Sequence, residues 1–210
     1  MSLPVGRQVS KIQNPPMQPT AESIAEEIFR LYNVHGADEY IGEPVSQMEH
    51  MCQAAQLAEK EDCEEEVVLA AFFHDFGHIC ANETGMQMDG YGVRNHEKIG
   101  ADYLRRAGFS ETVAKLVESH VQAKRYLTFK HPGYYSRLSE ASRRTLEFQG
   151  GQMDAAEALA FERDPLFDRY LKMRRWDEQA KEKSMPLPDL DRYRQMAIRH
   201  LKGHKLIAED

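Results

Sequence analysis

A run of seven apolar residues, Val67-Val68-Leu69-Ala70-Ala71-Phe72-Phe73, leads directly into His74 and Asp75. An imidazole and a carboxylate at the end of such a run are costly to bury unless something compensates them. A metal ion is the natural compensation, because neutral imidazole nitrogen and ionised carboxylate are both good ligands for iron, manganese or zinc. The pair therefore predicts a metal site in the interior of the fold.

Further residues of the same chemistry flank this pair: His50 upstream, and His96, His120 and Asp177 downstream. Taken singly, a histidine on a helix is more often a hydrogen-bonded structural residue, and an aspartate beside arginines is usually a surface ion pair. The ordered set of six favours ligands, and six ligands can serve two metal ions. Asp75 is a candidate bridge because a carboxylate has two oxygens. The other histidines, His35, His131, His200 and His204, are interpreted as ordinary loop or surface residues.

Composition bounds the class of protein. The chain has 210 residues, 41% apolar and 29% charged, with a formal net charge of -7, as expected for one globular domain that does not coat nucleic acid or an anionic membrane. We find no apolar stretch approaching the roughly 20 residues of a membrane span, and no apolar signal core at the N-terminus. Three cysteines without CxxC spacing predict reduced thiols and a cytoplasmic location.

The pattern along the chain is helical, without sustained strand alternation. We expect residues 1–19 to form a flexible N-terminal arm and residues 20–205 to form one all-α helical bundle with the metal site in its core. Thr20 and Ser110 are predicted to cap helices, and Asn95 to cap a helix that Gly108 stops. Pro44 is predicted in the first turn of the helix that carries His50. His74 and Asp75 are predicted on one helix, and His120 at the end of another.

The ligand set resembles the HD-domain superfamily, whose H…HD…D pattern is matched by His50, His74-Asp75 and Asp177. His96 and His120 narrow the resemblance to its dinuclear branch, and there to the mixed-valent diiron oxygenases, which include myo-inositol oxygenase and oxygenases that cleave carbon–phosphorus bonds. The resemblance implies two iron ions in an Fe(II)/Fe(III) pair. His50, His74, Asp75 and Asp177 would hold the first iron; Asp75, His96 and His120 would hold the second.

Other residues resemble the phosphonate-cleaving group in particular, over about Tyr40 to Lys181. Tyr40 and Glu43 stand at the spacing of that family's Tyr-x-x-Glu gate, which would move aside as substrate enters. The phosphonate would be held by residues at matching positions, namely His78, Lys124, Ser142, Thr145 and Arg174. The implied reaction uses O₂ to convert 1-hydroxy-2-aminoethylphosphonate, as the primary amine or its N-trimethyl form, to phosphate and glycine or glycine betaine.

Alternatives stay open at this point. An HD-type phosphohydrolase acting on a nucleotide or phosphate monoester would use the same metals to activate water. An inositol-type diiron oxygenase would take a polyol, although the basic cluster suits a phosphonate better. A non-catalytic helical module is disfavoured because all six ligands are intact. The expected partners are an organophosphonate and O₂, and the oligomeric state is left open. Candidates for contact with the substrate nitrogen are aromatic residues: Tyr91, Tyr126, Tyr134, Tyr135 and Trp176.

Overall fold

The computed structural model describes residues 18–40, 42–81 and 88–208. Within these ranges the regular structure is helical, apart from one antiparallel bridge between Glu39 and Ser46. The helices are α1 (Ala21–His35), α2 (Gln47–Lys60), α3 (Glu65–Phe73), α4 (Phe76–Cys80), α5 (His96–Ala107), α6 (Glu111–Lys130), α7 (Tyr134–Arg137), α8 (Glu140–Phe148), α9 (Ala155–Glu162), α10 (Phe167–Gln179) and α11 (Asp191–Ala208). The predicted all-α class is confirmed.

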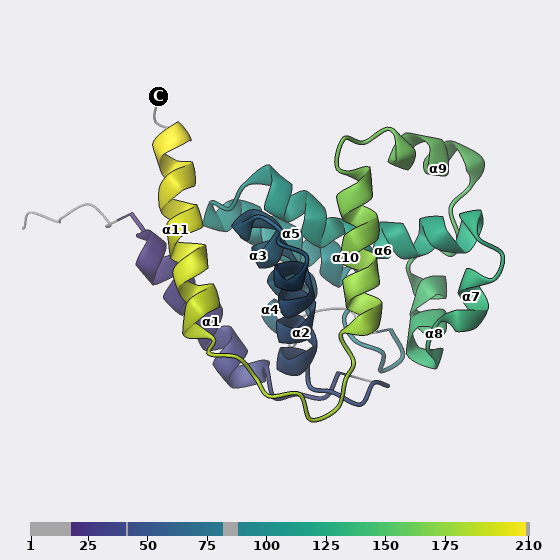
Figure 1. The fold of residues 1–210 in the computed structure, drawn as a ribbon, viewed down its shortest axis with the longest axis horizontal. Helices are drawn as coiled ribbons and strands as arrows, with labels where there is room; N and C mark the ends of the chain where they lie inside the picture. Colours follow the sequence, from purple (N-terminus) through teal and green to yellow (C-terminus); the bar gives the residue numbers. More distant parts are fainter. Residues whose placement is uncertain (1–17, 41, 82–87, 209–210) are drawn as a thin grey trace, which may run out of the picture.

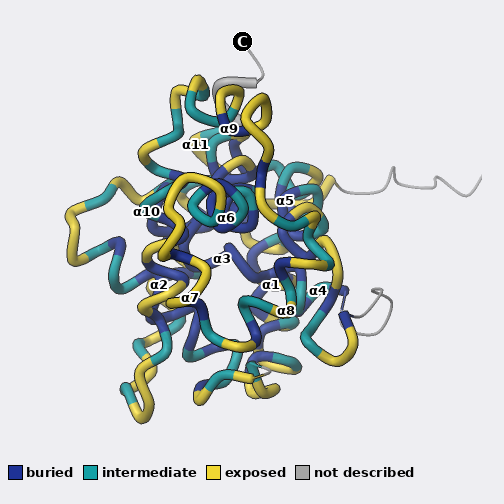
Figure 2. Tube along the Cα trace, turned by 90° about the vertical axis from the view of Figure 1, so that its right-hand side faces the viewer, coloured by how far each residue is buried: buried dark blue, intermediate teal, exposed yellow. Residues whose placement is uncertain are grey.

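Helix α3 lies at the centre of the bundle. Its apolar run is buried from end to end, and Phe72 and Phe73 have no exposed surface. It packs against α2, α6 and α11, and the burial-coloured trace shows it surrounded by the other helices (Figure 2). Burying each large apolar side chain contributes about 1.5–3 kcal/mol, so the run that ends in His74 is anchored firmly.

Two groups of helices lie on opposite sides of the molecule (Figure 1). Helices α1 and α11 pack against each other on one side, whereas α7, α8 and α9 lie at the opposite end, beyond α6 and α10. Helices α2, α6 and α10 run between the two groups. No helix in the described part of the chain is long and apolar enough to cross a membrane.

Side-chain caps define several helix starts as predicted. Thr20 accepts a hydrogen bond from the Ser23 amide at 3.1 Å, and Ser110 accepts one from the Val113 amide at 3.2 Å. Such caps are each worth about 1 kcal/mol. Asn95 occupies the cap position of α5 and Gly108 ends that helix in the left-handed region, but Asn95 makes no side-chain cap bond and itself has a positive φ of 58°.

Three local predictions are wrong. Pro44 precedes α2 rather than entering it, because Ser46 caps that helix in a reciprocal bond with Glu49. His120 lies in the middle of α6, which continues to Lys130. His74 and Asp75 are not on one helix but at the break between α3 and α4. Most of the arm predicted over residues 1–19 lies outside the described residues.

Candidate metal centre

The break between α3 and α4 places Asp75. His74 keeps helical angles, whereas Asp75 leaves the helix with φ -103° and ψ 12°. The chain then brings α4 into contact with α5 at Gly77, where an added Cβ would lie 1.8 Å from the carbonyl oxygen of His96. Only glycine permits this approach, and the approach holds the start of α5 beside Asp75.

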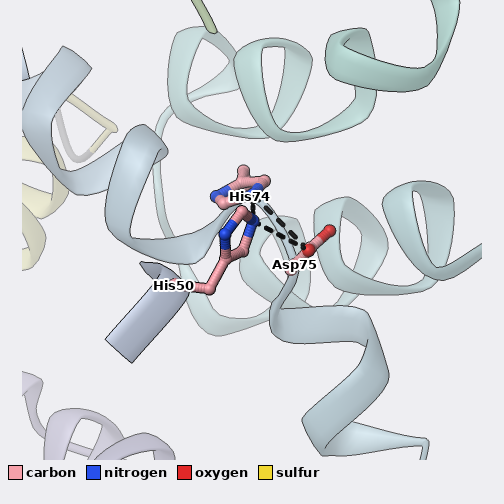
Figure 3. A group of neighbouring side chains, drawn as sticks. All are labelled: His50, His74 and Asp75. Carbon is pink, nitrogen blue, oxygen red and sulfur yellow. Dashed lines mark hydrogen bonds and ion pairs between the residues drawn. The ribbon is translucent and has the colours of Figure 1, made fainter. Parts of the chain in front are cut away.

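A first cluster of ligand atoms forms around the buried side chains of His50, His74, Asp75 and Asp177. The Nε2 atoms of His50 and His74 are 3.0 Å apart, and Asp75 Oδ2 lies 3.5 Å from each of them. Asp177 Oδ1 lies 3.4 Å from His50 Nε2 and 4.0 Å from His74 Nε2. Figure 3 shows His50, from α2, converging on the neighbouring residues His74 and Asp75 at the break between α3 and α4.

A second cluster uses the other oxygen of Asp75. The Nε2 atoms of His96 and His120 are 3.0 Å apart, and each lies 3.3 Å from Asp75 Oδ1. The carboxylate of Asp75 therefore directs Oδ2 to one histidine pair and Oδ1 to the other. This is the arrangement in which one carboxylate bridges two metal ions.

Hydrogen bonds to carbonyl oxygens orient all four imidazoles. The Nδ1 atoms lie 2.8–3.1 Å from backbone carbonyl oxygens, which can only accept; the partners are Ala180 for His50, Ala71 for His74, Val93 for His96 and Val117 for His120. In a neutral ring, Nδ1 then carries the proton and Nε2 presents its lone pair. Each cluster thus contains two nitrogen lone pairs that face each other at 3.0 Å.

These groups fit two metal ions on chemical grounds. Facing lone pairs repel unless a cation lies between them, and Asp75 Oδ2 is buried without a hydrogen-bond partner in the described structure. A donor set of imidazoles and carboxylates suits iron, manganese or zinc. His50, His74, Asp75 and Asp177 are placed to hold one ion, and Asp75, His96 and His120 to hold a second.

The electrostatics keep these side chains ready to bind a cation. Burial lowers the pKa of His74 to about 4, so the ring is neutral. Burial alone would raise the pKa of Asp75 and of Asp177. The surrounding histidines outweigh this effect for Asp75, and Arg174 with two histidines does so for Asp177, so both pKa values lie well below the usual range.

The clusters open into a pocket with about 610 Å³ of empty space. Its wall includes the five predicted phosphonate-holding residues, which the structure brings together from four helices: His78, Lys124, Ser142, Thr145 and Arg174. Lys124 donates to Thr145 Oγ1 at 3.0 Å. Arg174 donates to Asp177 Oδ2 at 2.5 Å and makes a longer bond of 3.4 Å to Ser142 Oγ.

Two charged donors of this wall are almost fully buried. Lys124 and Arg174 are each 3% exposed. Burial, and then the nearby guanidinium of Arg174, lower the pKa of Lys124 to about 7. Arg174 stays charged, because its carboxylate neighbours outweigh burial and raise its pKa. The pocket therefore has a strongly donating, cationic end within an acidic protein, which is the environment that an oxyanion needs.

His78 contributes an imidazole that stays neutral. Its ring stacks on His96 with centroids 3.9 Å apart, and its Nδ1 accepts the Val93 amide at 3.0 Å. Burial first, and then the neighbouring imidazole of His96, lower its pKa well below the ordinary value. With Nδ1 used as an acceptor, His78 carries its proton on Nε2, and that N–H is its remaining donor.

Tyr40 and Glu43 also line the pocket. The ring of Tyr40 stacks on that of His50, with centroids 4.1 Å apart. Glu43 Oε1 accepts from Ser139 at 2.6 Å and from Lys181 at 2.5 Å. Glu43 is thus fixed to the cap of α8 and to the chain after α10. Ile41, which separates this predicted pair, lies outside the described residues.

Several pocket residues were missed in the sequence. Gln47 lines the pocket, and its Oε1 is buried without a partner in the described structure. It lies three residues before His50 on α2, so helical spacing could have indicated it. Lys181 does not line the pocket but fixes Glu43, and no signal in the sequence could have indicated that contact. Of the aromatic candidates for the substrate nitrogen, only Tyr91 lines the pocket.

The histidines set aside as non-ligands stay outside both clusters. His35 ends α1, and His131 follows α6 at the rim of a different cavity. His200 accepts the Ser110 amide at 3.1 Å and stacks on Phe109, and His204 lies beside it. These contacts give His200 a structural place on α11.

Comparison with known proteins agrees with this geometry. The model of the HD domain family matches residues 48–166. An uncharacterized protein of Acanthamoeba polyphaga mimivirus is 45% identical over 175 residues, covering 83% of this chain and 80% of the relative. A glycine-betaine-forming 1-hydroxy-2-(trimethylamino)ethylphosphonate dioxygenase of Leisingera caerulea is 38% identical over 182 residues, covering 87% and 92%. A hydroxymethylphosphonate dioxygenase of Gimesia maris is 39% identical over 167 residues, covering 79% and 82%.

Proposed function

This chain belongs to the HD-domain family, in the group that contains phosphonate dioxygenases, and we propose that it uses O₂ to cleave the carbon–phosphorus bond of a small 1-hydroxyphosphonate. The observation that carries the proposal is one pocket in which two metal-binding clusters share Asp75 and face the buried donors Lys124 and Arg174. Buried cationic donors suit a phosphonate dianion better than a neutral polyol.

The cofactor that suits this reaction is a pair of iron ions in Fe(II)/Fe(III) form. His50, His74, Asp75 and Asp177 would hold one iron, and Asp75, His96 and His120 the other. When bound, the irons would supply the redox chemistry with O₂ that amino-acid side chains lack. The residues of the chain would fix the positions of the ions.

The phosphonate end of the substrate is assigned to the cationic wall. Lys124 and Arg174 would give charge-assisted hydrogen bonds to the phosphonate oxygens. The hydroxyls of Ser142 and Thr145 and the Nε2–H of His78 would complete its coordination. Such bonds orient the carbon that carries the hydroxyl group toward the metal centre, which is the positional part of the catalysis.

The overall reaction balances without a further reductant. A 1-hydroxyphosphonate and one O₂ contain all the atoms of one carboxylic acid and one phosphate. The C–P bond and one C–H bond of the substrate break, and the carbon is oxidised as O₂ is reduced. For the 2-amino substrate the products are phosphate and glycine, and for its N-trimethyl form they are phosphate and glycine betaine.

The nitrogen end of the pocket favours the primary amine. A trimethylammonium group is recognised by open aromatic faces. The two tyrosines that line the pocket are engaged: Arg144 lies 5.8 Å from the Tyr91 centroid, and Tyr40 stacks on His50 with the Lys181 amine 6.0 Å from its centroid. The unpartnered Gln47 Oε1 instead offers an acceptor to the pocket, which suits an ammonium with N–H groups.

Phosphate release with and without O₂ tests the proposal. Iron-loaded protein is incubated with 1-hydroxy-2-aminoethylphosphonate, its N-trimethyl form and hydroxymethylphosphonate. We expect phosphate release that requires O₂ and consumes one O₂ per phosphate, fastest with the primary amine. Phosphate release from phosphate monoesters without O₂ would indicate the phosphohydrolase instead. No O₂-dependent release from any of the three phosphonates would reject the proposal.

A further inference from the structure

The guanidinium of Arg174 is held by a partner on each of its nitrogens. Nη1 donates to Asp177 Oδ2 at 2.5 Å, and Nη2 points to Ser142 Oγ at 3.4 Å. Nε donates to Tyr134 Oη at 2.9 Å and to Glu178 Oε1 at 2.8 Å. The direction in which Arg174 presents its remaining N–H groups to the pocket is therefore decided by the groups behind it as well as by those in front.

The hydroxyl of Tyr134 has a double role in this arrangement. Its oxygen accepts from Arg174, while its proton is donated to Glu178 Oε1, the same oxygen that Arg174 contacts. Burial and the neighbouring Glu178 carboxylate raise the pKa of Tyr134, so the hydroxyl keeps its proton. Tyr134 therefore satisfies part of the hydrogen-bonding capacity of Glu178 that would otherwise fall to Arg174.

Two carboxylates compete for this one guanidinium. Asp177 lies on the side of the Arg174 guanidinium that faces the metal cluster, and Glu178 lies on the side that faces away from the pocket. An arginine and a carboxylate prefer two parallel hydrogen bonds when nothing intervenes. Without the Tyr134 hydroxyl, Glu178 is free to form that pair, which would turn Arg174 away from Asp177 and Ser142.

Tyr134 acts on the pocket from outside it. It lies on α7 and lines a separate surface cavity together with Glu178, His131 and Arg137, whereas Arg174 lines the metal pocket. Tyr134 is nevertheless buried, with 5% of its surface exposed. Its hydroxyl thus links the α7 segment to α10 and reaches the pocket only through Arg174.

We propose that Tyr134 is a positioning residue of the anion-binding end of the pocket: its hydroxyl restrains Glu178 and keeps Arg174 turned toward Ser142 and Asp177. The identity of the anion as a phosphonate rests on the proposed function. The positioning itself concerns any tetrahedral oxyanion that Arg174 binds. Removing the hydroxyl should weaken anion binding, and removing the charge of Glu178 should restore it.

Binding of methylphosphonate to the iron-loaded protein without O₂, measured by calorimetry, tests this inference. Tyr134→Phe removes only the hydroxyl and is expected to raise the dissociation constant about five- to tenfold, the usual net effect of one lost hydrogen bond. Tyr126→Phe is the matched control, because Tyr126 also donates to a glutamate, Glu162 at 2.7 Å. That variant should bind methylphosphonate as the wild type does.

Rescue separates positioning from a merely structural role. In Tyr134→Phe with Glu178→Gln the competing charge is gone, so the affinity should return to within about twofold of wild type. Glu178→Gln alone should bind at least as tightly as wild type, and this variant tests the idea even if Tyr134→Phe does not fold. Unchanged affinity in Tyr134→Phe, no rescue in the double variant, or a fivefold loss in Glu178→Gln would each overturn it.

The test of the proposed function can be distinguished from the test of Tyr134. Wild-type protein that binds methylphosphonate but releases no phosphate from any hydroxyphosphonate would reject the proposed function and leave the role of Tyr134 intact. Wild-type protein that does not bind methylphosphonate at all would overturn both. Normal O₂-dependent turnover with an unchanged dissociation constant in Tyr134→Phe would reject only the positioning role.

Discussion

Lys124 on α6 and Arg174 on α10 bring two buried cationic groups to one pocket. Burial is the main cause, and the Arg174 guanidinium the second, that lowers the pKa of the Lys124 amine to about 7. Two like charges this close destabilise the free protein. Under the proposed function, a bound phosphonate would offset this cost. The pair therefore lowers the stability of the free protein in favour of anion binding. This loss of stability can be measured directly.

Lys124→Met should stabilise the folded protein and weaken anion binding. The unfolded amine has a pKa near 10.5 and the folded one near 7, so the unfolded state binds more protons between these values and wild-type stability rises with pH there. The gain in Lys124→Met should thus be largest near pH 6, about 1–3 kcal/mol, and should shrink toward pH 10. Urea denaturation at several pH values measures it.

A surface lysine on the same helix provides the control. Lys115 is 3.9 Å from Asp164 with 44% of its side chain exposed, and Lys115→Met should change stability by less than about 0.5 kcal/mol at any pH. A Lys124→Met variant that is less stable than wild type at neutral pH, or that keeps its affinity for methylphosphonate, would contradict this account of the pocket.

Asp75→Asn should remove both metal ions at once. The amide keeps the shape of the side chain but replaces one ligand oxygen by a donor and removes the charge that both histidine pairs face. We expect bound iron to fall from two ions per chain to nearly none, and turnover to fall more than about a hundredfold. Metal analysis after gel filtration measures the first effect. Asp102→Asn, a surface acid paired with Arg105, should keep both ions. Two tightly bound irons in Asp75→Asn would disprove the bridge.

Gln47→Leu should reduce the preference for a primary amine. If Gln47 Oε1 accepts an N–H of the substrate, its loss should weaken binding of 2-aminoethylphosphonate by about tenfold and leave propylphosphonate and the N-trimethyl analogue nearly unchanged. Calorimetry on iron-loaded protein without O₂ compares the three ligands. Gln56→Leu is the control, because Gln56 lies on the same helix and has an unpartnered oxygen, but lines another cavity. Equal losses of affinity for all three ligands would contradict the role of Gln47 Oε1 as an acceptor for the substrate ammonium.

His200 should make stability fall at acid pH. Burial lowers its pKa, with Glu66 and Glu65 on α3 partly opposing and His204 adding to the effect. A histidine with a lowered folded pKa binds its proton more readily when unfolded, so stability is lost as pH falls below the ordinary value near 6.5. Protonation also ends acceptance of the Ser110 amide.

The test compares how steeply stability changes with pH in wild type and in two histidine variants. His200→Gln should reduce the loss of stability between about pH 7 and pH 5 by roughly 0.5–1 kcal/mol relative to wild type, because glutamine accepts the amide without titrating. His204→Gln, one turn further on α11, should keep most of the slope. Identical slopes in wild type and His200→Gln would show that other groups set the acid sensitivity.

The clustering of the six candidate ligands could be predicted from sequence because their chemistry is unusual there. A histidine and an aspartate after seven apolar residues have few explanations, and His50, His96 and Asp177 gain meaning from that pair. The structure places all six in two clusters. The same holds for the helices, because serine and threonine caps act over three or four residues.

The residues that contact the pocket residues from outside the pocket could not be predicted from sequence in this way. Glu178 and Lys181 are ordinary surface-type residues in sequence, and Tyr134, named there for the substrate nitrogen, lines a different cavity. Each acquires its contacts from a segment that only the fold brings near. The break at His74 and Asp75 was missed for a related reason. The apolar run favours a continuous helix, and only the packing of α4 on α5 through Gly77 requires the chain to turn there.

The carbonyl bonds of the four imidazoles also set an order of assembly. His74, His96 and His120 are each oriented by a carbonyl three residues earlier, whereas His50 depends on Ala180, and its cluster also needs Asp177. A chain emerging from the ribosome thus contains every residue of the second cluster long before it contains Asp177 and Ala180. The first cluster can therefore be completed only when α10 has docked against α2.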